Sequence, residues 1–300
     1  MTRNQNDAAS VARPESKWTR LAWVAALAAV VYVVAQAVAA AALAGLSMPA
    51  PRGSPGATPA PQLAWALVSA AILVIGLVPL VPRLSGGSVP RWLVLAAFLY
   101  SVSTVNNAIE ITIFTRLGSA GYVAALGVLP ALLCTALFAT VRPSGAAPAG
   151  LVEQPPAPGL AWRLALAWLA FPAVYLTFGG LVSPLVIESY SAQGSLLVVP
   201  PMRTIVGVQA IRSVFFLLPT LAVVERWTGS RLSLWLALAW AHWTLVGLFG
   251  LVLPSDLMTP TLRLVHSLEI GADSFAYTGI VVALLARHHA QPVIGRPSAA

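Results

Sequence analysis

The chain has 300 residues, of which 58% are hydrophobic and only 9% are charged. Because a soluble globular protein carries about 25% charged residues, this composition excludes that class and predicts an all-α protein that crosses a membrane several times. The net charge of +8 does not indicate nucleic acid, since the basic residues lie in short loops between apolar segments. There they set topology and contact lipid headgroups, so the expected partner is the lipid bilayer and not nucleic acid.

Eight apolar segments are long enough to cross a hydrocarbon core of about 30 Å, which takes about 20 helical residues. They cover residues 21–46, 62–81, 92–114, 119–140, 160–181, 204–224, 232–253 and 262–286. Stretches rich in proline and glycine separate them, and the stretch near 141–159 predicts a linker between two four-helix halves. The sequence therefore predicts a transmembrane bundle of about eight helices over residues 21–286, with tails at 1–20 and 287–300.

The basic residues also predict how the chain is oriented. If the N-terminus is cytoplasmic, twelve Lys and Arg residues fall in cytoplasmic segments and three in outer segments. An excess of Lys and Arg marks the cytoplasmic side of a membrane protein. We therefore expect a multi-pass protein of the plasma membrane with both termini in the cytoplasm.

Polar groups form a stripe along the last apolar segment. At about 100° per residue, Arg263, His266, Glu269, Asp273 and Tyr277 lie on one narrow face of a helix. Charged side chains within a membrane span normally face the bundle interior or a water-filled cavity. We therefore expect this face to point inward, and the apolar opposite face to contact lipid or another helix.

Four other segments supply further polar groups. These are Tyr32 and Gln36 in the first segment, Ser103, Asn106, Asn107 and Glu110 in the third, Gln209 and Arg212 in the sixth, and His242 in the seventh. At 1.5 Å per residue, Glu110, Arg212, His266 and Glu269, together with Gln36, fall in the outer half of the membrane, which predicts a shared polar cavity that opens outward. Since an isolated charge is costly in a low dielectric, Arg212 is expected to pair with Glu110 or Glu269.

One interpretation of this cavity is a functional site, as intramembrane ionisable residues suggest. Its candidate catalytic residues are Glu110, Arg212, His266 and Glu269. Its candidate substrate-binding residues are Asn106, Asn107, Gln209, Arg263, Asp273 and Tyr277. Such a site would apply acid/base or metal-assisted chemistry to a small or lipid-linked substrate.

A divalent metal is the cofactor that this interpretation allows. His266 and Glu269 are three residues apart, the spacing of the Glu-x-x-His motif of helix bundles in reversed order. Glu110 and Asp273 would complete an oxygen-rich ligand set, which suits zinc, manganese or iron. The zinc-protease motif and any Cys/His cluster are absent from the sequence.

Two alternatives stand beside an enzyme. An ion- or proton-coupled transporter would use the carboxylates and histidines as a relay. A non-catalytic membrane partner protein would use the ion pairs only to fix helix packing. The apolar segment at 179–201 is expected to be a packed outer loop rather than a lid over the cavity.

Four stretches together resemble a family of uncharacterised multi-pass bacterial integral membrane proteins. They are NNAIE at 106–110, YLTFGGLVSPLVIESY at 175–190, VQAIRSVFFLLP at 208–219 and LPSDLMTPTLRLVHSLEIGADSFAYTGIVVALL at 253–285. The resemblance places Glu110, Gln209, Arg212, Arg263, His266 and Glu269 at the polar positions of the family's motifs. The family's Trp-Gln-Asn-Pro reads VSPL here. The resemblance implies a bacterial membrane protein and no particular activity.

Overall fold

The structure, a computed structural model, describes residues 16–51, 59–143, 157–191, 195–253 and 258–286. Within these residues it is all-α, and eight helical stretches are long and apolar enough to span a membrane. They are Lys17–Gly45, Gln62–Arg83, Ser88–Ile113, Ala120–Ala139, Gly159–Ser191, Met202–Arg226, Arg231–Leu251 and Pro260–Leu285. The predicted fold class and number of spans are confirmed. Most of the two predicted tails and of the predicted linker lies outside the described residues.

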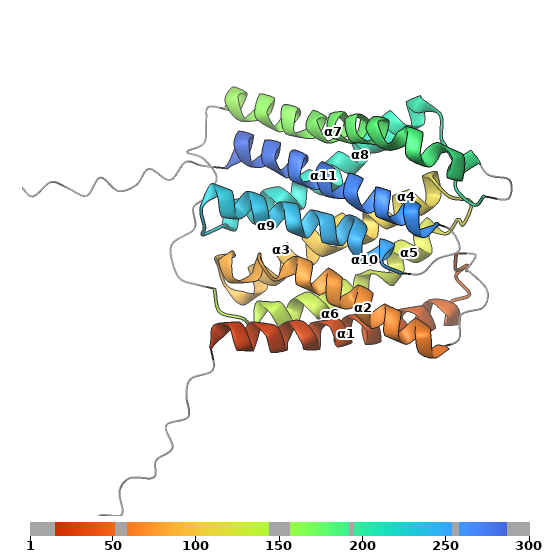
Figure 1. The fold of residues 1–300 in the computed structure, drawn as a ribbon. Helices are drawn as coiled ribbons and strands as arrows, with labels where there is room; N and C mark the ends of the chain where they lie inside the picture. The colour runs from red at the N-terminus through yellow and green to blue at the C-terminus, as the bar shows by residue number, and fades with distance from the viewer. Residues whose placement is uncertain (1–15, 52–58, 144–156, 192–194, 254–257, 287–300) are drawn as a thin grey trace, which may run out of the picture.

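The individual elements carry the labels of Figure 1. In chain order they are α1 (Lys17–Gly45), α2 (Pro59–Leu77), the 3₁₀ turn η1 (Val81–Arg83), α3 (Ser88–Leu99), the π-helical turn η2 (Tyr100–Val105), α4 (Asn106–Ile113), α5 (Ala120–Leu126), α6 (Val128–Ala139), α7 (Ala157–Ser191), α8 (Met202–Arg226), α9 (Arg231–Trp243), the π-helical turn η3 (Thr244–Leu248), α10 (Phe249–Leu251) and α11 (Pro260–Leu285). The first helix begins earlier than predicted because Ser16 caps it, accepting a hydrogen bond from the Thr19 backbone N–H at 3.1 Å.

The helix α7 extends further than the sequence predicts. It continues to Ser191, ten residues beyond the predicted end at 181, so the predicted loop at 179–201 is helical over its first part. A glycine pair and Pro184 predict a break, but membrane-spanning helices tolerate both where neighbouring groups satisfy the backbone. The exposed Leu185 gives this part of α7 an apolar surface that suits lipid.

The last part of the same segment is held by backbone hydrogen bonds to the end of α4. The Val198 N–H donates to the Phe114 carbonyl at 2.8 Å, and the Arg116 N–H donates to the Leu196 carbonyl at 2.8 Å. Two such bonds make a short antiparallel contact. They favour the packed-loop interpretation of residues 195–201 over a lid.

Two spans that the sequence presents as continuous α-helices contain π-helical turns, which are rare and frequently lie at functional sites. The turn η2 separates α3 from α4, the turn η3 separates α9 from α10, and the two turns contact each other. Each turn packs against a glycine. A Cβ atom at Gly127 would overlap Thr104 of η2, and a Cβ atom at Gly76 would overlap Thr244 of η3. A side chain at either glycine would therefore force the turn to move.

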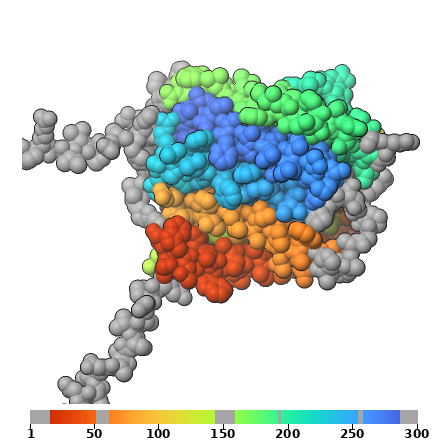
Figure 2. All heavy atoms as spheres, viewed as in Figure 1, coloured from red at the N-terminus to blue at the C-terminus, as the bar shows by residue number. Residues whose placement is uncertain are grey.

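The spans form a bundle with α11 between α7 and α9 on one side, and with α1 against α2 and α6 on the other (Figure 1). Figure 2 shows the side chains of α1, α2, α9 and α11 following one another across one face. Figure 1 also shows that α1 begins and α11 ends at the same end of the bundle. Since successive spans run in opposite directions, the end of α4 and the first turns of α11 lie toward the other end.

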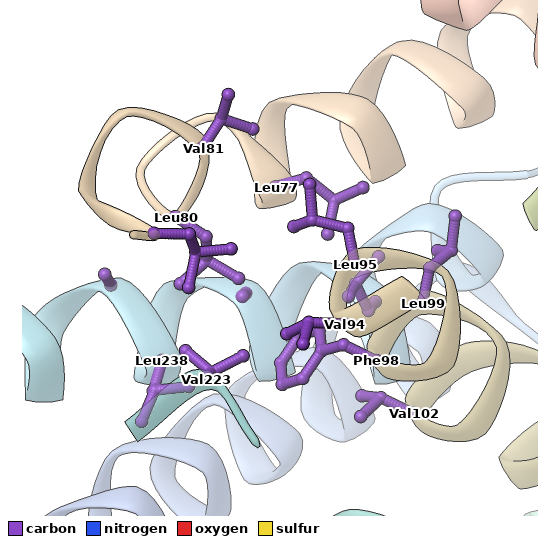
Figure 3. Close-up of a cluster of buried hydrophobic side chains, with 14 of the residues drawn as sticks. Leu77, Leu80, Val81, Val94, Leu95, Phe98, Leu99, Val102, Val223 and Leu238 are labelled. Carbon is purple, nitrogen blue, oxygen red and sulfur yellow. The ribbon is translucent and has the colours of Figure 1, made fainter. Parts of the chain in front are cut away.

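Apolar side chains fill the half of the bundle nearer the start of α1. Phe98 and Leu95 of α3 are fully buried there, together with Leu77 of α2. Figure 3 shows them with Val223 from α8 and Leu238 from α9. Within a bilayer, close van der Waals packing of this kind holds helices together. The polar groups described next lie toward the opposite end.

Candidate intramembrane polar site

An ion pair joins α4 to α8. Arg212 Nη1 lies 2.6 Å from Glu110 Oε1, and the exposed fractions of the two side chains are 4% and 36%. A buried guanidinium requires a nearby negative charge because it cannot lose its proton. The predicted pairing of Arg212 is confirmed, with Glu110 as its partner.

Three aromatic rings surround the Arg212 guanidinium. Its central carbon lies 5.5 Å from the ring centres of Phe171 and Tyr175 on α7 and 5.7 Å from that of Phe216 on α8. A desolvated cation over an aromatic face gains about 2 kcal/mol. Sequence reasoning missed these rings. Their spacing was the available signal, since Phe171 and Tyr175, like Arg212 and Phe216, are one helical turn apart.

A chain of three hydrogen-bonding side chains joins α7 to α11. His266 Nδ1 lies 2.8 Å from Glu269 Oε2, and the Tyr190 hydroxyl lies 3.1 Å from His266 Nε2. An ionised carboxylate only accepts hydrogen bonds, so the Nδ1–H donates to Glu269 and Nε2 accepts from the hydroxyl. Tyr190 was not among the predicted site residues. It reaches the site because α7 continues past the predicted end.

The start of α11 is fixed by its own sequence. Thr259 accepts a hydrogen bond from the Leu262 N–H at 3.2 Å, and Pro260 occupies the first helical position. Both features favour helix initiation at this point. The Arg263 guanidinium then donates from Nη1 to the Leu253 carbonyl at 2.6 Å, which ties the new helix to the end of the preceding span. These contacts set the direction in which the polar stripe of α11 points.

The polar groups line one cavity of about 300 Å³. Its walls include nine of the ten predicted site residues, namely Asn106, Asn107, Glu110, Arg212, Arg263, His266, Glu269, Asp273 and Tyr277. Gln209 does not line it, although its side chain is buried nearby in the bundle. Groups from α4, α8 and α11 that the sequence places far apart thus share one space.

His242 also lines the cavity, but its contacts are those of a side chain that packs the interior of the bundle. Its Nε2 lies 3.1 Å from the Thr220 hydroxyl, and its ring makes edge-to-face contacts with Phe98, Phe216 and Tyr277. Aromatic pairs of this geometry stabilise packing by about 0.5–1.5 kcal/mol. The surroundings of His242 are therefore those of a packed core histidine.

Several polar atoms on the walls have no hydrogen-bond partner within the described part of the chain. They include Nε of Arg212, Nε of Arg263, Oδ1 of Asp273 and Oδ1 of Asn106, all of which are buried. A buried polar atom without a partner costs about 1–3 kcal/mol. At least two donors and two acceptors are therefore available to water or to a polar ligand.

The arrangement does not fit the predicted divalent metal. Both ring nitrogens of His266 are engaged, one with Glu269 and the other with Tyr190. In the described residues no three His, Cys, Asp or Glu side chains are grouped so that they could hold a metal ion. A protein metal site generally needs at least three such ligands. Within the described residues, His266 and Glu269 therefore do not belong to a metal site.

No protein-family model, curated protein or solved structure matches this chain. The class of this protein is therefore inferred from its membrane spans and its buried polar groups alone. The chain is a polytopic helical membrane protein with ionisable residues buried among its helices.

Proposed function

We propose that this is a bacterial plasma-membrane protein whose cavity binds the polar group of a small or lipid-linked substrate and moves protons to and from it. The observation that supports this most is the chain Tyr190–His266–Glu269. A carboxylate that orients an imidazole, which in turn faces a hydroxyl, is the arrangement that general acid/base catalysis uses.

The roles of the individual residues follow from their contacts. Glu269 holds the His266 ring and stabilises its protonated form. His266 Nε2 takes up a proton from the substrate directly or through the Tyr190 hydroxyl and returns it in a later step. Arg212, neutralised by Glu110, and Asn107 on the facing wall bind polar atoms of the substrate.

The cavity is proposed to open toward the outside of the cell. Twelve basic residues would then lie in cytoplasmic segments and three in outer ones. The shared end at which α1 begins and α11 ends would face the cytoplasm (Figure 1). The resemblance to bacterial integral membrane proteins supports the choice of membrane.

A proton- or ion-coupled transporter is less well supported. Transport requires a polar route through the whole bundle. The half opposite the cavity instead holds the packed apolar cluster of Figure 3, including Leu77, Phe98 and Leu238. A purely structural ion-pair network predicts instead that substitutions at Glu269 and His266 prevent folding and do not act on turnover alone.

Glu269→Gln tests the proposed function. The full chain in lipid nanodiscs is incubated with bacterial lipid and polar extracts, and mass spectrometry records which compounds are converted. We expect wild-type protein and the control Glu225→Gln, whose side chain is exposed at the end of α8, to convert the same compound. Glu269→Gln should lower that rate by about 100-fold or more, because it removes the group that orients the base. Conversion by Glu269→Gln at the wild-type rate, or by none of the three proteins, would overturn the proposal.

A further inference from the structure

A second cavity of about 250 Å³ adjoins the polar one, and we call it the α7 groove. The two share the wall residues Phe114, Tyr175, Tyr190, His266 and Glu269. Beyond these, the groove is lined mainly by apolar residues of α7 and of residues 198–205. The proposed acid/base residues therefore lie at the junction of a polar and an apolar compartment.

The α7 groove reaches the surface of the bundle. Three of its lining residues are among the exposed large hydrophobic side chains, namely Ile187, Val199 and Met202, with exposed fractions of 43%, 52% and 63%. They belong to or adjoin helices that are long and apolar enough to span a membrane, so we expect this surface to contact hydrocarbon. Along α7 the lining runs from Tyr175 to Tyr190, which is about 22 Å at 1.5 Å per residue.

A glycine pair forms part of the groove wall beside the junction. A Cβ atom at Gly179 would lie 3.3 Å from Glu269 Oε1, whereas a Cβ atom at Gly180 would meet nothing within 4 Å. The absence of side chains brings the groove close to the carboxylate and leaves open space next to it. Both features suit a hydrocarbon chain that lies in the groove and ends at the junction beside Glu269.

The polar cavity offers contacts of both signs. Its acids are Glu110, Glu269 and Asp273, and its permanent cations are Arg212 and Arg263. The unpartnered wall atoms include two guanidinium N–H groups, one carboxylate oxygen and the amide oxygen of Asn106. A headgroup with an anionic oxygen and an ammonium group offers an acceptor to the two guanidinium groups and donors to the two oxygens, since buried polar atoms require partners of opposite polarity.

We propose that the substrate is a long-chain zwitterionic amphiphile. Its hydrocarbon chain lies in the α7 groove and enters sideways from the bilayer, between α7 and the start of α8. Its anionic group contacts Arg212 and Arg263, and its ammonium group contacts Asp273. This inference rests on the proposed function, because it assigns a substrate class to the same site.

Photo-crosslinking of the full chain in nanodiscs tests the assignment. The probe is a single-chain phosphoethanolamine lipid with a diazirine in the middle of its chain, and mass spectrometry maps the modified residues. We expect labelling concentrated in residues 176–187. Gly180→Leu, which fills the groove, should lower this labelling about fivefold or more. Gly207→Leu is the matched control, because Gly207 lies on α8, lines neither cavity and would also accept a Cβ atom without contact.

The outcomes separate this inference from the proposed function. Equal labelling of Gly180→Leu and Gly207→Leu would overturn the groove assignment. The zwitterionic headgroup would be overturned if a fatty acid or an alkylamine of the same chain length labelled the groove as strongly as the phosphoethanolamine probe. Neither result concerns proton transfer, which the Glu269→Gln comparison measures. If the Glu269→Gln protein keeps the wild-type turnover and is still labelled in the groove, the proposed function is contradicted and the binding assignment stands.

Discussion

Glu110→Gln should be the most destabilising substitution in the polar site. It leaves the Arg212 guanidinium, which is only 4% exposed, without its ion-pair partner at 2.6 Å. Arginine keeps its charge in a protein interior, and breaking a buried ion pair costs about 3–5 kcal/mol. Because Glu110 itself is 36% exposed, we expect the lower end of that range. Denaturant-induced unfolding in mixed micelles measures the change.

Removing both charges should restore much of this loss. The double variant Glu110→Gln with Arg212→Met replaces the guanidinium by an apolar side chain that still packs among Phe171, Tyr175 and Phe216. Replacing a whole buried pair by apolar groups is often neutral or stabilising. A coupling free energy near zero in this double-mutant cycle would show that the two side chains do not interact.

His266→Ala should lower turnover by about 10²–10⁴-fold without unfolding the protein. The imidazole forms hydrogen bonds with both the Tyr190 hydroxyl and the Glu269 carboxylate. Loss of a general acid/base group lowers a rate by about 10²–10⁴-fold. Unlike Glu110→Gln, this substitution does not leave an arginine charge buried without its partner. The unfolding free energy should therefore change by only about 1–3 kcal/mol. Turnover of the converted compound and micellar unfolding are measured on the same preparation.

The control for this substitution is His242→Ala. His242 is packed among aromatic rings, so its removal should cost stability while some turnover of the surviving folded protein remains. If His266→Ala instead fails to accumulate in the membrane, and His242→Ala accumulates with normal turnover, the polar groups of α11 are structural.

The number of spans was predictable because hydrocarbon thickness fixes the length of an apolar helix. The end of α7 was not predictable, since glycine and proline residues such as Pro184 end helices in water but not always in a membrane. The π-helical turns η2 and η3 also escaped prediction. Hydropathy reports which side chains are apolar and carries no information on whether a backbone N–H reaches back four residues or five.

The candidate site was predictable where it depends on charge. Glu110, Arg212, Glu269 and Asp273 stand out because charged groups are rare in hydrocarbon, and helical periodicity placed several of them on common faces. Tyr190 and the aromatic rings around Arg212 did not stand out, because aromatic residues are ordinary in membrane spans. Gln209 shares a face with Arg212 in the sequence but does not reach the cavity wall.

Single-cysteine labelling tests most directly whether polar groups of separate helices share one cavity. Cysteines are placed at Asn107 and Asp273 on the cavity wall, and at Leu264 and Leu268, which are 61% and 60% exposed on the surface of α11. The background carries Cys134→Ala, since that thiol is buried. A charged, water-soluble thiosulfonate needs hydrated thiolate, so both cavity positions should react about tenfold faster or more than both leucine positions. Faster reaction at Leu264 and Leu268 than at Asn107 and Asp273 would contradict the shared polar cavity.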